Sequence, residues 1–447
     1  MKIPAKKRKN MFWSIVICAL SCIGLIALVL TKPTVEWRGH KIGVYWLPAF
    51  AGAVLLLATG LLTPQETWAG LTSSGEMNPI KILALFLSLT FLSVYLDELG
   101  FFRRMAFSML RHARGSQKKL FLCLYFLVSA LTVFTSNDVV VLTFTPFICC
   151  FCKEERISPV PYLVGEFVAA NTWSMALVIG NPTNIYLSAV CGIDFAEYFS
   201  VMWLPTLLSG LTALGVLFFV FRKQLSTPLS PLNKTAETAD KTLLTIGVAH
   251  LAACILCLAF ASYLSLSMWL ISVSFAGSLA VCTLVYAITK KHRPVSGRLL
   301  GHSFRREPWE LVPFVLSMFV LVLALEKYGV TGEIAALLAG GGDSAELFKY
   351  GATSFLSANV INNIPMSVLF GGVIESGVVT NAKIYATVIG SNLGAYLTPI
   401  GALAGIMWTG LLKTHEVEFS FKNFIGYGVT VAIPALLAAL FGLWIAV

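Results

Sequence analysis

The sequence predicts an all-α, polytopic membrane protein that is built as an inverted repeat. Of its 447 residues, 57% are hydrophobic and only 12% are charged, whereas soluble domains carry roughly 25% charged residues. Apolar stretches long enough to cross a bilayer recur roughly ten times along the chain. Two of the apolar regions, far apart in the sequence, also resemble each other.

These two regions, 131–184 and 355–405, share a pattern of small, amide and proline residues that interrupt apolar runs. Irregular backbone is tolerated at membrane depth only where it is buried in protein or lines a cavity. Paired interruptions in two halves of a chain are typical of the substrate site of a secondary transporter. The aligned pairs are Asn137 with Asn362, Asp138 with Asn363, Asn171 with Asn392, and Gly180 with Gly401.

The first half begins with N-terminal spans in region 1–79 and continues with a first repeat in region 80–221. The basic N-terminus resembles a signal peptide, but the following apolar run is a full span long, so we interpret it as the first membrane helix. The expected elements are spans at 11–30, 42–62 and 80–96, a basic interfacial helix within 99–119, a re-entrant hairpin at 120–151, a broken span at 160–190 and a span at 202–221.

A polar linker at 222–241 joins the halves and is expected on the cytoplasmic side. Region 242–309 holds two spans, 243–264 and 268–289, and a basic loop. Region 310–447 is the second repeat. Its expected elements are a span at 311–325, an interfacial helix at 331–339, an outer-side hairpin at 348–374, a broken span at 384–412 and a last helix at 424–447.

Basic residues set the predicted orientation. With the first hairpin on the cytoplasmic side, 23 of the 32 Lys and Arg residues lie in cytoplasmic segments, as the positive-inside rule requires. The cluster at 2–9 falls on the outer side, so the side of the N-terminus stays open. The net charge of +10 is thereby explained without nucleic acid.

Several motifs resemble the ion transporter superfamily, which includes dicarboxylate/sodium symporters and ArsB-type arsenite permeases. Residues 179–184 read IGNPTN and residues 397–402 read LTPIGA, similar to the paired runs of that superfamily. Ser136-Asn137-Asp138 is similar to the Ser-Asn-Thr hairpin tip of the dicarboxylate carriers. The resemblance implies a scaffold and a moving unit that contains the hairpins and broken spans.

Three departures resemble the arsenite branch more closely. Asp138 replaces the threonine of the dicarboxylate carriers, residues 361–365 read INNIP, and residues 96–102 read LDELGFF. The resemblance covers most of the chain from about Ile80 to Trp408. Its paired tips are specific for the superfamily and less specific for the substrate.

Two acidic residues within apolar stretches are candidates for coupling transport to protons. A carboxylate at membrane depth is costly unless it is solvated, paired or bound to a cation. Asp138, at the first hairpin tip, could carry a proton or hold a sodium ion, or it could cap the second arm of the hairpin. Glu166, five residues before Asn171 on the same broken span, is the second proton-coupling candidate.

Amide, hydroxyl and glycine residues at the interruptions complete the predicted site. Asparagine side chains can donate and accept hydrogen bonds without charge, which suits a neutral solute such as arsenous acid. The alternative is that they cap helices and form turns. The predicted substrate- or ion-binding residues are Ser136, Asn137, Asp138, Asn171, Thr172, Gly180, Asn181, Asn362, Asn363, Asn392, Thr398 and Gly401.

The predicted function is secondary active transport, with proton-coupled efflux of arsenite or antimonite favoured. Sodium- or proton-coupled transport of a carboxylate or inorganic oxyanion is the alternative, and a channel is a remote one. No enzyme signature, cofactor or metal site is expected. Expected partners are the small solute and the lipid bilayer of the plasma membrane, which the chain crosses several times. A homodimer and a separate ATPase subunit stay open.

Overall fold

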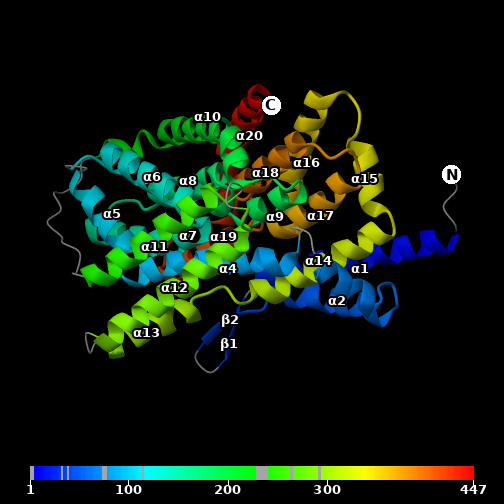
Figure 1. The fold of residues 1–447 in the computed structure, drawn as a ribbon. Helices are drawn as coiled ribbons and strands as arrows, with labels where there is room; N and C mark the ends of the chain where they lie inside the picture. Colours follow the sequence, from blue (N-terminus) through cyan, green and yellow to red (C-terminus); the bar gives the residue numbers. More distant parts are fainter. Residues whose placement is uncertain are drawn as a thin grey trace.

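The computed structural model describes residues 5–31, 34–37, 40–72, 78–112, 115–227, 240–261, 265–289 and 293–447. Most of the predicted linker at 222–241 lies outside these ranges. Helices account for nearly all of the described chain (Figure 1).

The first half contains a short β-hairpin and a series of helices. Its elements are α1 (Ala5–Thr31), β1 (Thr34–Trp37), β2 (His40–Gly43), α2 (Leu47–Ala58), α3 (Pro64–Leu71), α4 (Pro79–Glu98), α5 (Phe101–His112), α6 (Gln117–Phe134), α7 (Asn137–Glu155), α8 (Val160–Trp173), the 3₁₀ turns η1 (Ser174–Ala176) and η2 (Val178–Gly180), α9 (Pro182–Val190), α10 (Phe195–Phe221) and η3 (Gln224–Ser226).

The second half is helical throughout its described residues. Its elements are α11 (Lys241–Ala259), α12 (Met268–Thr289), α13 (Arg293–Arg305), α14 (Leu311–Lys327), α15 (Val330–Leu338), α16 (Asp343–Ile361), α17 (Asn363–Glu375), α18 (Asn381–Gly394), α19 (Leu403–Thr414) and α20 (Phe421–Ala446). The helix pairs α6–α7 and α16–α17 lie within a few residues of the stretches expected to form the hairpins, and α8–α9 and α18–α19 lie within a few residues of the expected broken spans.

The number of long apolar helices is lower than the predicted ten spans. Seven of the described helices are long and apolar enough to cross a membrane, or eight if α14 and α15, bent by 77°, form one span. The shortfall arises because the apolar stretch at 42–62 yields only the 12-residue α2, and because the broken spans divide into short helices.

One local expectation is corrected, because the basic loop expected within 290–309 contains α13. Two small elements were not expected. Strands β1 and β2 pair antiparallel with Thr34 opposite Gly43, and α3 follows α2 and begins with a capping box between Thr63 and Glu66.

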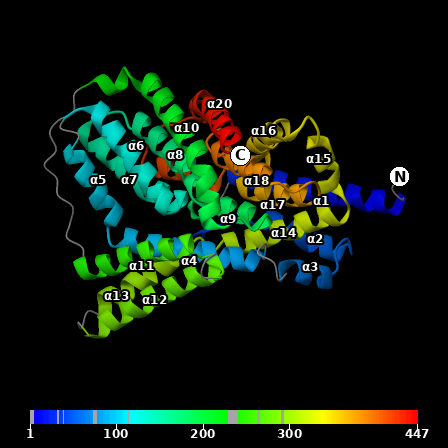
Figure 2. The same ribbon diagram turned by 45° about the horizontal axis from the view of Figure 1, so that its top comes forward.

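The helices form two layers that repeat the same packing in each half. In both views the first row contains α11, α12, α4, α14 and α2, and the second row contains α6–α10 and α16–α20 (Figures 1 and 2). Helices α11 and α12 pack against α4, just as α1 and α2 pack against α14. The first helix of each broken span, α8 or α18, contacts both helices of the hairpin in its own half. Contacts also cross between the halves, because α7 contacts α19 and α17 contacts α9. The two halves therefore interlock.

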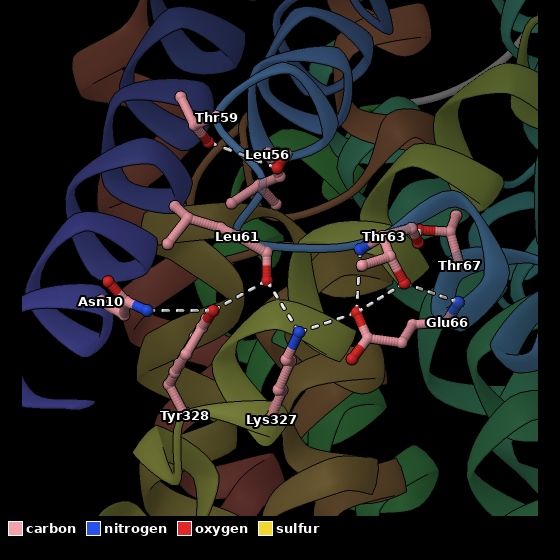
Figure 3. Close-up of polar contacts among 9 residues, drawn as sticks. All are labelled: Asn10, Leu56, Thr59, Leu61, Thr63, Glu66, Thr67, Lys327 and Tyr328. Carbon is pink, nitrogen blue, oxygen red and sulfur yellow. Dashed lines mark hydrogen bonds and ion pairs between the residues drawn. The ribbon is translucent and has the colours of Figure 1, made fainter. Parts of the chain in front are cut away.

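A polar clamp holds the end of α14 against α1 and the α2–α3 connection (Figure 3). Lys327 Nζ donates to the Leu61 carbonyl at 3.1 Å and pairs with Glu66 Oε2 at 2.7 Å. The Tyr328 hydroxyl donates to the same Leu61 carbonyl at 2.8 Å and accepts from Asn10 Nδ2 at 3.4 Å. This clamp fixes helices of the first row to one another.

Candidate functional site

Each hairpin turns at a residue that precedes its second arm. Ser136 is the N-cap of α7 and Asn362 is the N-cap of α17. The helix caps therefore pair Ser136 with Asn362 and Asn137 with Asn363. This register differs by one residue from the sequence alignment, which had paired Asn137 with Asn362.

Glycine is required where the broken spans fold back on themselves. A Cβ on Gly180 would collide with the carbonyl oxygen of Ser174 in the same break. In the second break, a Cβ on Gly401 would lie 2.6 Å from the carbonyl oxygen of Gly394. Only glycine has room for these close backbone approaches, so the backbone of each break requires its glycine.

The first hairpin tip is hydrogen-bonded to the first break. Asn171 donates through Nδ2 to the Phe167 carbonyl at 2.8 Å, so its Oδ1 faces the tip as an acceptor. Asn137 donates to that oxygen through Nδ2 at 3.1 Å. The remaining amide oxygen of Asn137 is buried without a hydrogen-bond partner, and so is the hydroxyl of neighbouring Ser136.

The second tip is held to the second break mainly by backbone groups. Asn362 Nδ2 donates to the Ile400 carbonyl at 2.9 Å, and the backbone N–H of Asn363 donates to the Gly401 carbonyl at 2.9 Å. The side-chain oxygen Oδ1 of Asn363 is again buried without a partner. Thr398 lies nearby and donates to Asn359 Oδ1 at 2.8 Å.

Asn392 joins the two broken spans. Its Oδ1 accepts hydrogen bonds from Ser174 Oγ at 2.8 Å and Asn181 Nδ2 at 3.1 Å, while its Nδ2 donates to Asn184 Oδ1 at 2.7 Å. All four side chains are nearly or fully buried. Thr172 makes a further link between the spans through the Tyr396 hydroxyl, at 3.3 Å.

The structure therefore divides the predicted amides into two kinds. Four of them, Asn171, Asn181, Asn362 and Asn392, are occupied with one another or with neighbouring groups and hold the breaks together. Asn137 and Asn363, at the tips, each retain an unpaired acceptor. Buried polar groups are nearly always hydrogen-bonded, so the unpaired acceptors are the groups with capacity for a solute or ion.

Asp138 does not cap the second arm of the first hairpin, because Ser136 occupies the cap position and Asp138 is the second residue of α7. It is half-buried, and none of the described groups donates a hydrogen bond to it. Its charge lies within electrostatic reach of Tyr45, just before α2, and so does the charge of Glu310, at the start of α14. This charge effect links the first hairpin tip to the segment just before α2.

Glu166 is fully buried in a separate place. Its carboxyl group accepts hydrogen bonds from the Thr145 hydroxyl at 3.2 Å and from Trp408 Nε1 at 3.2 Å. These partners belong to α7 and α19, so Glu166 ties α7, α8 and α19 together. Phe167 and Phe424 pack on the Trp408 ring at 5.1 and 5.6 Å between centroids.

Sequence reasoning missed four residues of this region. Asn184 and Asn359 are amides within apolar runs, and that signal could have revealed them. Tyr45 and Glu310 could not be found in this way, because they lie far from both repeated regions in sequence. Within the described ranges, no group of three or more His, Cys, Asp and Glu residues could hold a metal ion. No Lys, Arg or His side chain takes part in the site hydrogen bonds described above.

Comparison with known proteins identifies the family. The profile described as "Citrate transporter" matches residues 25–382. The arsenical pump membrane protein of Escherichia coli strain K12 is 28% identical over 427 residues, covering 92% of this chain and 96% of that protein. A putative arsenical pump membrane protein of Bacillus subtilis is 24% identical, covering 90% of this chain and 94% of that protein.

A solved structure shares the fold. The YdaH transporter of Alcanivorax borkumensis superimposes with a TM-score of 0.52 at 14% sequence identity, covering 98% of each chain. The chain is thus a multi-pass transporter of a bacterial-type cell membrane rather than an enzyme, as the motifs predicted. The family profile spans most of the chain, and the protein belongs to the citrate transporter family within the ion transporter superfamily.

Proposed function

We propose that this transporter exports arsenite or antimonite in exchange for protons. The observation that carries the proposal is the pair of unpaired amide oxygens, on Asn137 and Asn363, at the two hairpin tips. Both are hydrogen-bond acceptors. An anion would need donors there, whereas arsenous acid is neutral and presents three O–H donors. Relatives that match over nearly the whole chain are named arsenical pump membrane proteins.

The proposed moving unit consists of the two hairpins and the two broken spans. Asn392 and its partners Ser174, Asn181 and Asn184 bind the broken spans to each other, so they can move together. The first-row helices α4 and α14 form the scaffold on which they move. Each tip acceptor then binds the solute in one step of the cycle and releases it after the unit has shifted.

Asp138 is the proposed proton carrier. It lies on the moving unit, within electrostatic reach of Tyr45 just before α2, so its surroundings change when the unit moves. The hydrogen bonds of Glu166 join α7, α8 and α19, which all belong to the moving unit, so we assign it the weaker claim to that role.

Uptake of a carboxylate is the second candidate, because the matching profile is described as a citrate transporter. The N-terminal ends of α7 and α17 could supply backbone N–H groups to such an anion. Against this candidate, the tips present acceptors, and no cationic side chain contributes to the site hydrogen bonds described above.

The test compares arsenite accumulation in sensitive cells that express the wild type or Asp138→Asn. Membrane abundance of both proteins is measured by immunoblot. We expect the wild type to lower accumulation and Asp138→Asn to lose this effect. Glu333→Gln, on α15 and away from the site, should behave as the wild type. If wild-type protein leaves accumulation unchanged, arsenite export is refuted, and citrate uptake is measured next.

A further inference from the structure

A groove of about 370 Å³ lies between α1, α14 and α15 on one side and the second hairpin on the other. Its lining is almost entirely apolar and includes Ile23, Leu325, Val360 and Leu369. Ile23 and Val360 are 60% and 61% exposed. The groove therefore opens onto an apolar outer surface, as expected for one that faces lipid.

Two thiols line this groove. Cys18 and Cys22 are both free cysteines of α1. Residues four apart lie on one face of a helix, with Cβ atoms about 5–6 Å apart, and the two thiols are close enough to interact electrostatically. Cys18 Sγ also approaches the Leu321 carbonyl of α14 at 3.5 Å.

We propose that this groove is a binding site for trivalent arsenicals that carry an apolar organic substituent, with Cys18 and Cys22 as the arsenic ligands. Thiol sulfur is a soft ligand, and two sulfurs on one helix face can bind one arsenic atom. The site is separate from the amide tips, and the proposal does not rest on arsenite export.

The chemistry is a condensation without electron transfer. In R–As(OH)₂, two As–O bonds break and two As–S bonds form, and each departing hydroxide takes one thiol proton and leaves as water. Arsenic remains trivalent and the adduct is neutral. A neutral adduct suits a groove whose lining contains no charged side chain, because an unpaired charge or hydroxyl there would be costly.

The groove also selects the third substituent. Arsenous acid would leave one hydroxyl on arsenic with no polar side chain to receive it. An aryl group instead packs against Leu325 and Leu369, where burial of apolar surface is favourable. The site therefore prefers an organic arsenical over the inorganic acid.

The test uses phenylarsine oxide and the purified full-length protein in detergent, with intact-mass spectrometry as the readout. The wild type should form an adduct that resists excess glutathione and is removed by dithiothreitol. All variants carry Cys149→Ser, Cys150→Ser and Cys152→Ser, because these three free cysteines include the exposed Cys150 and could bind the arsenical as well. In this background, Cys18→Ser and Cys22→Ser should each lose the glutathione-resistant adduct. The matched control is the Cys254→Ser/Cys257→Ser double variant on α11, where Cys254 is fully buried; it should retain the adduct.

A second variant leaves both thiols in place. Ala19 lines the groove and faces its open side, so Ala19→Trp should fill the groove and slow adduct formation without disturbing the core. Size-exclusion profiles and melting temperatures verify that all variants are folded. The proposal is overturned if the wild type forms no adduct, if the resistant adduct survives in both single-serine variants, or if Ala19→Trp reacts as fast as the wild type.

Discussion

Replacing Asn392 by alanine tests whether the breaks are held together by the amide network. The side chain makes three hydrogen bonds across the interface between broken spans, to Ser174, Asn181 and Asn184. It also donates to the Val388 carbonyl of its own helix at 2.9 Å. Alanine keeps the helix and removes all of these side-chain bonds.

The expected loss of unfolding free energy depends on which hydrogen-bonding partners of Asn392 are left unpaired. Ser174 Oγ can still donate to the Asn171 carbonyl. Asn181 Nδ2 and Asn184 Oδ1 have no other described partner and stay buried. A buried polar group left without a partner costs about 1–3 kcal/mol, so two such groups cost about 2–6 kcal/mol of unfolding free energy.

The assay is unfolding of the purified protein in mixed micelles by titration with a denaturing detergent. Asn359→Ala serves as the matched control, because it leaves only the half-buried Thr398 hydroxyl unpaired, which water can reach. We expect that variant to lose less than about 1 kcal/mol. A loss for Asn392→Ala that is no larger than for Asn359→Ala would refute the network as a structural link.

Three further predictions concern packing, pH and charge. Gly180→Ala should abolish transport and lower the melting temperature, because the new Cβ collides with the Ser174 carbonyl, and immunoblots with transport assays will show whether folded protein remains. The Lys327 ammonium holds the pKa of Glu66 at about 2, below its usual 4.5. This contact therefore stabilises the protein above pH 4.5, and its contribution to stability disappears as the pH falls to 2. Lys327→Met should make the melting temperature depend less on pH between 4.5 and 2, and an unchanged pH dependence would contradict the assignment. Glu166→Gln keeps the hydrogen-bonding capacity of the side chain and removes its charge, so we expect wild-type stability and retained export. A loss of export equal to that of Asp138→Asn would instead make Glu166 a proton carrier.

The interruptions were predictable because their chemistry is local. Proline, glycine and asparagine within apolar runs mark the places where a membrane helix cannot continue, and both breaks and both tips lie where these residues occur. The helix boundaries give a register one residue away from the sequence alignment, because the N-cap of α7 is Ser136 and the N-cap of α17 is Asn362.

The contacts between distant segments could not be derived from the chain alone. Nothing near Tyr45 in the sequence indicates that it lies within electrostatic reach of Asp138. The packing of α1 and α2 against α14 also joins segments that lie far apart in the sequence.

The first turn of α7 shows how one tip can serve both solute and proton. Successive residues of a helix point about 100° apart, so Asn137 and Asp138 must address different neighbours. Asn137 binds Asn171 within the moving unit and keeps one acceptor unpaired, whereas the charge of Asp138 lies within electrostatic reach of Tyr45, just before α2. Under the proposed mechanism, a shift of this turn changes the exposure of the solute ligand and the surroundings of the carboxyl in the same movement. Solute movement is then coupled to proton movement because Asn137 and Asp138 are adjacent on one helix turn. This coupling requires no long pathway between two separate sites.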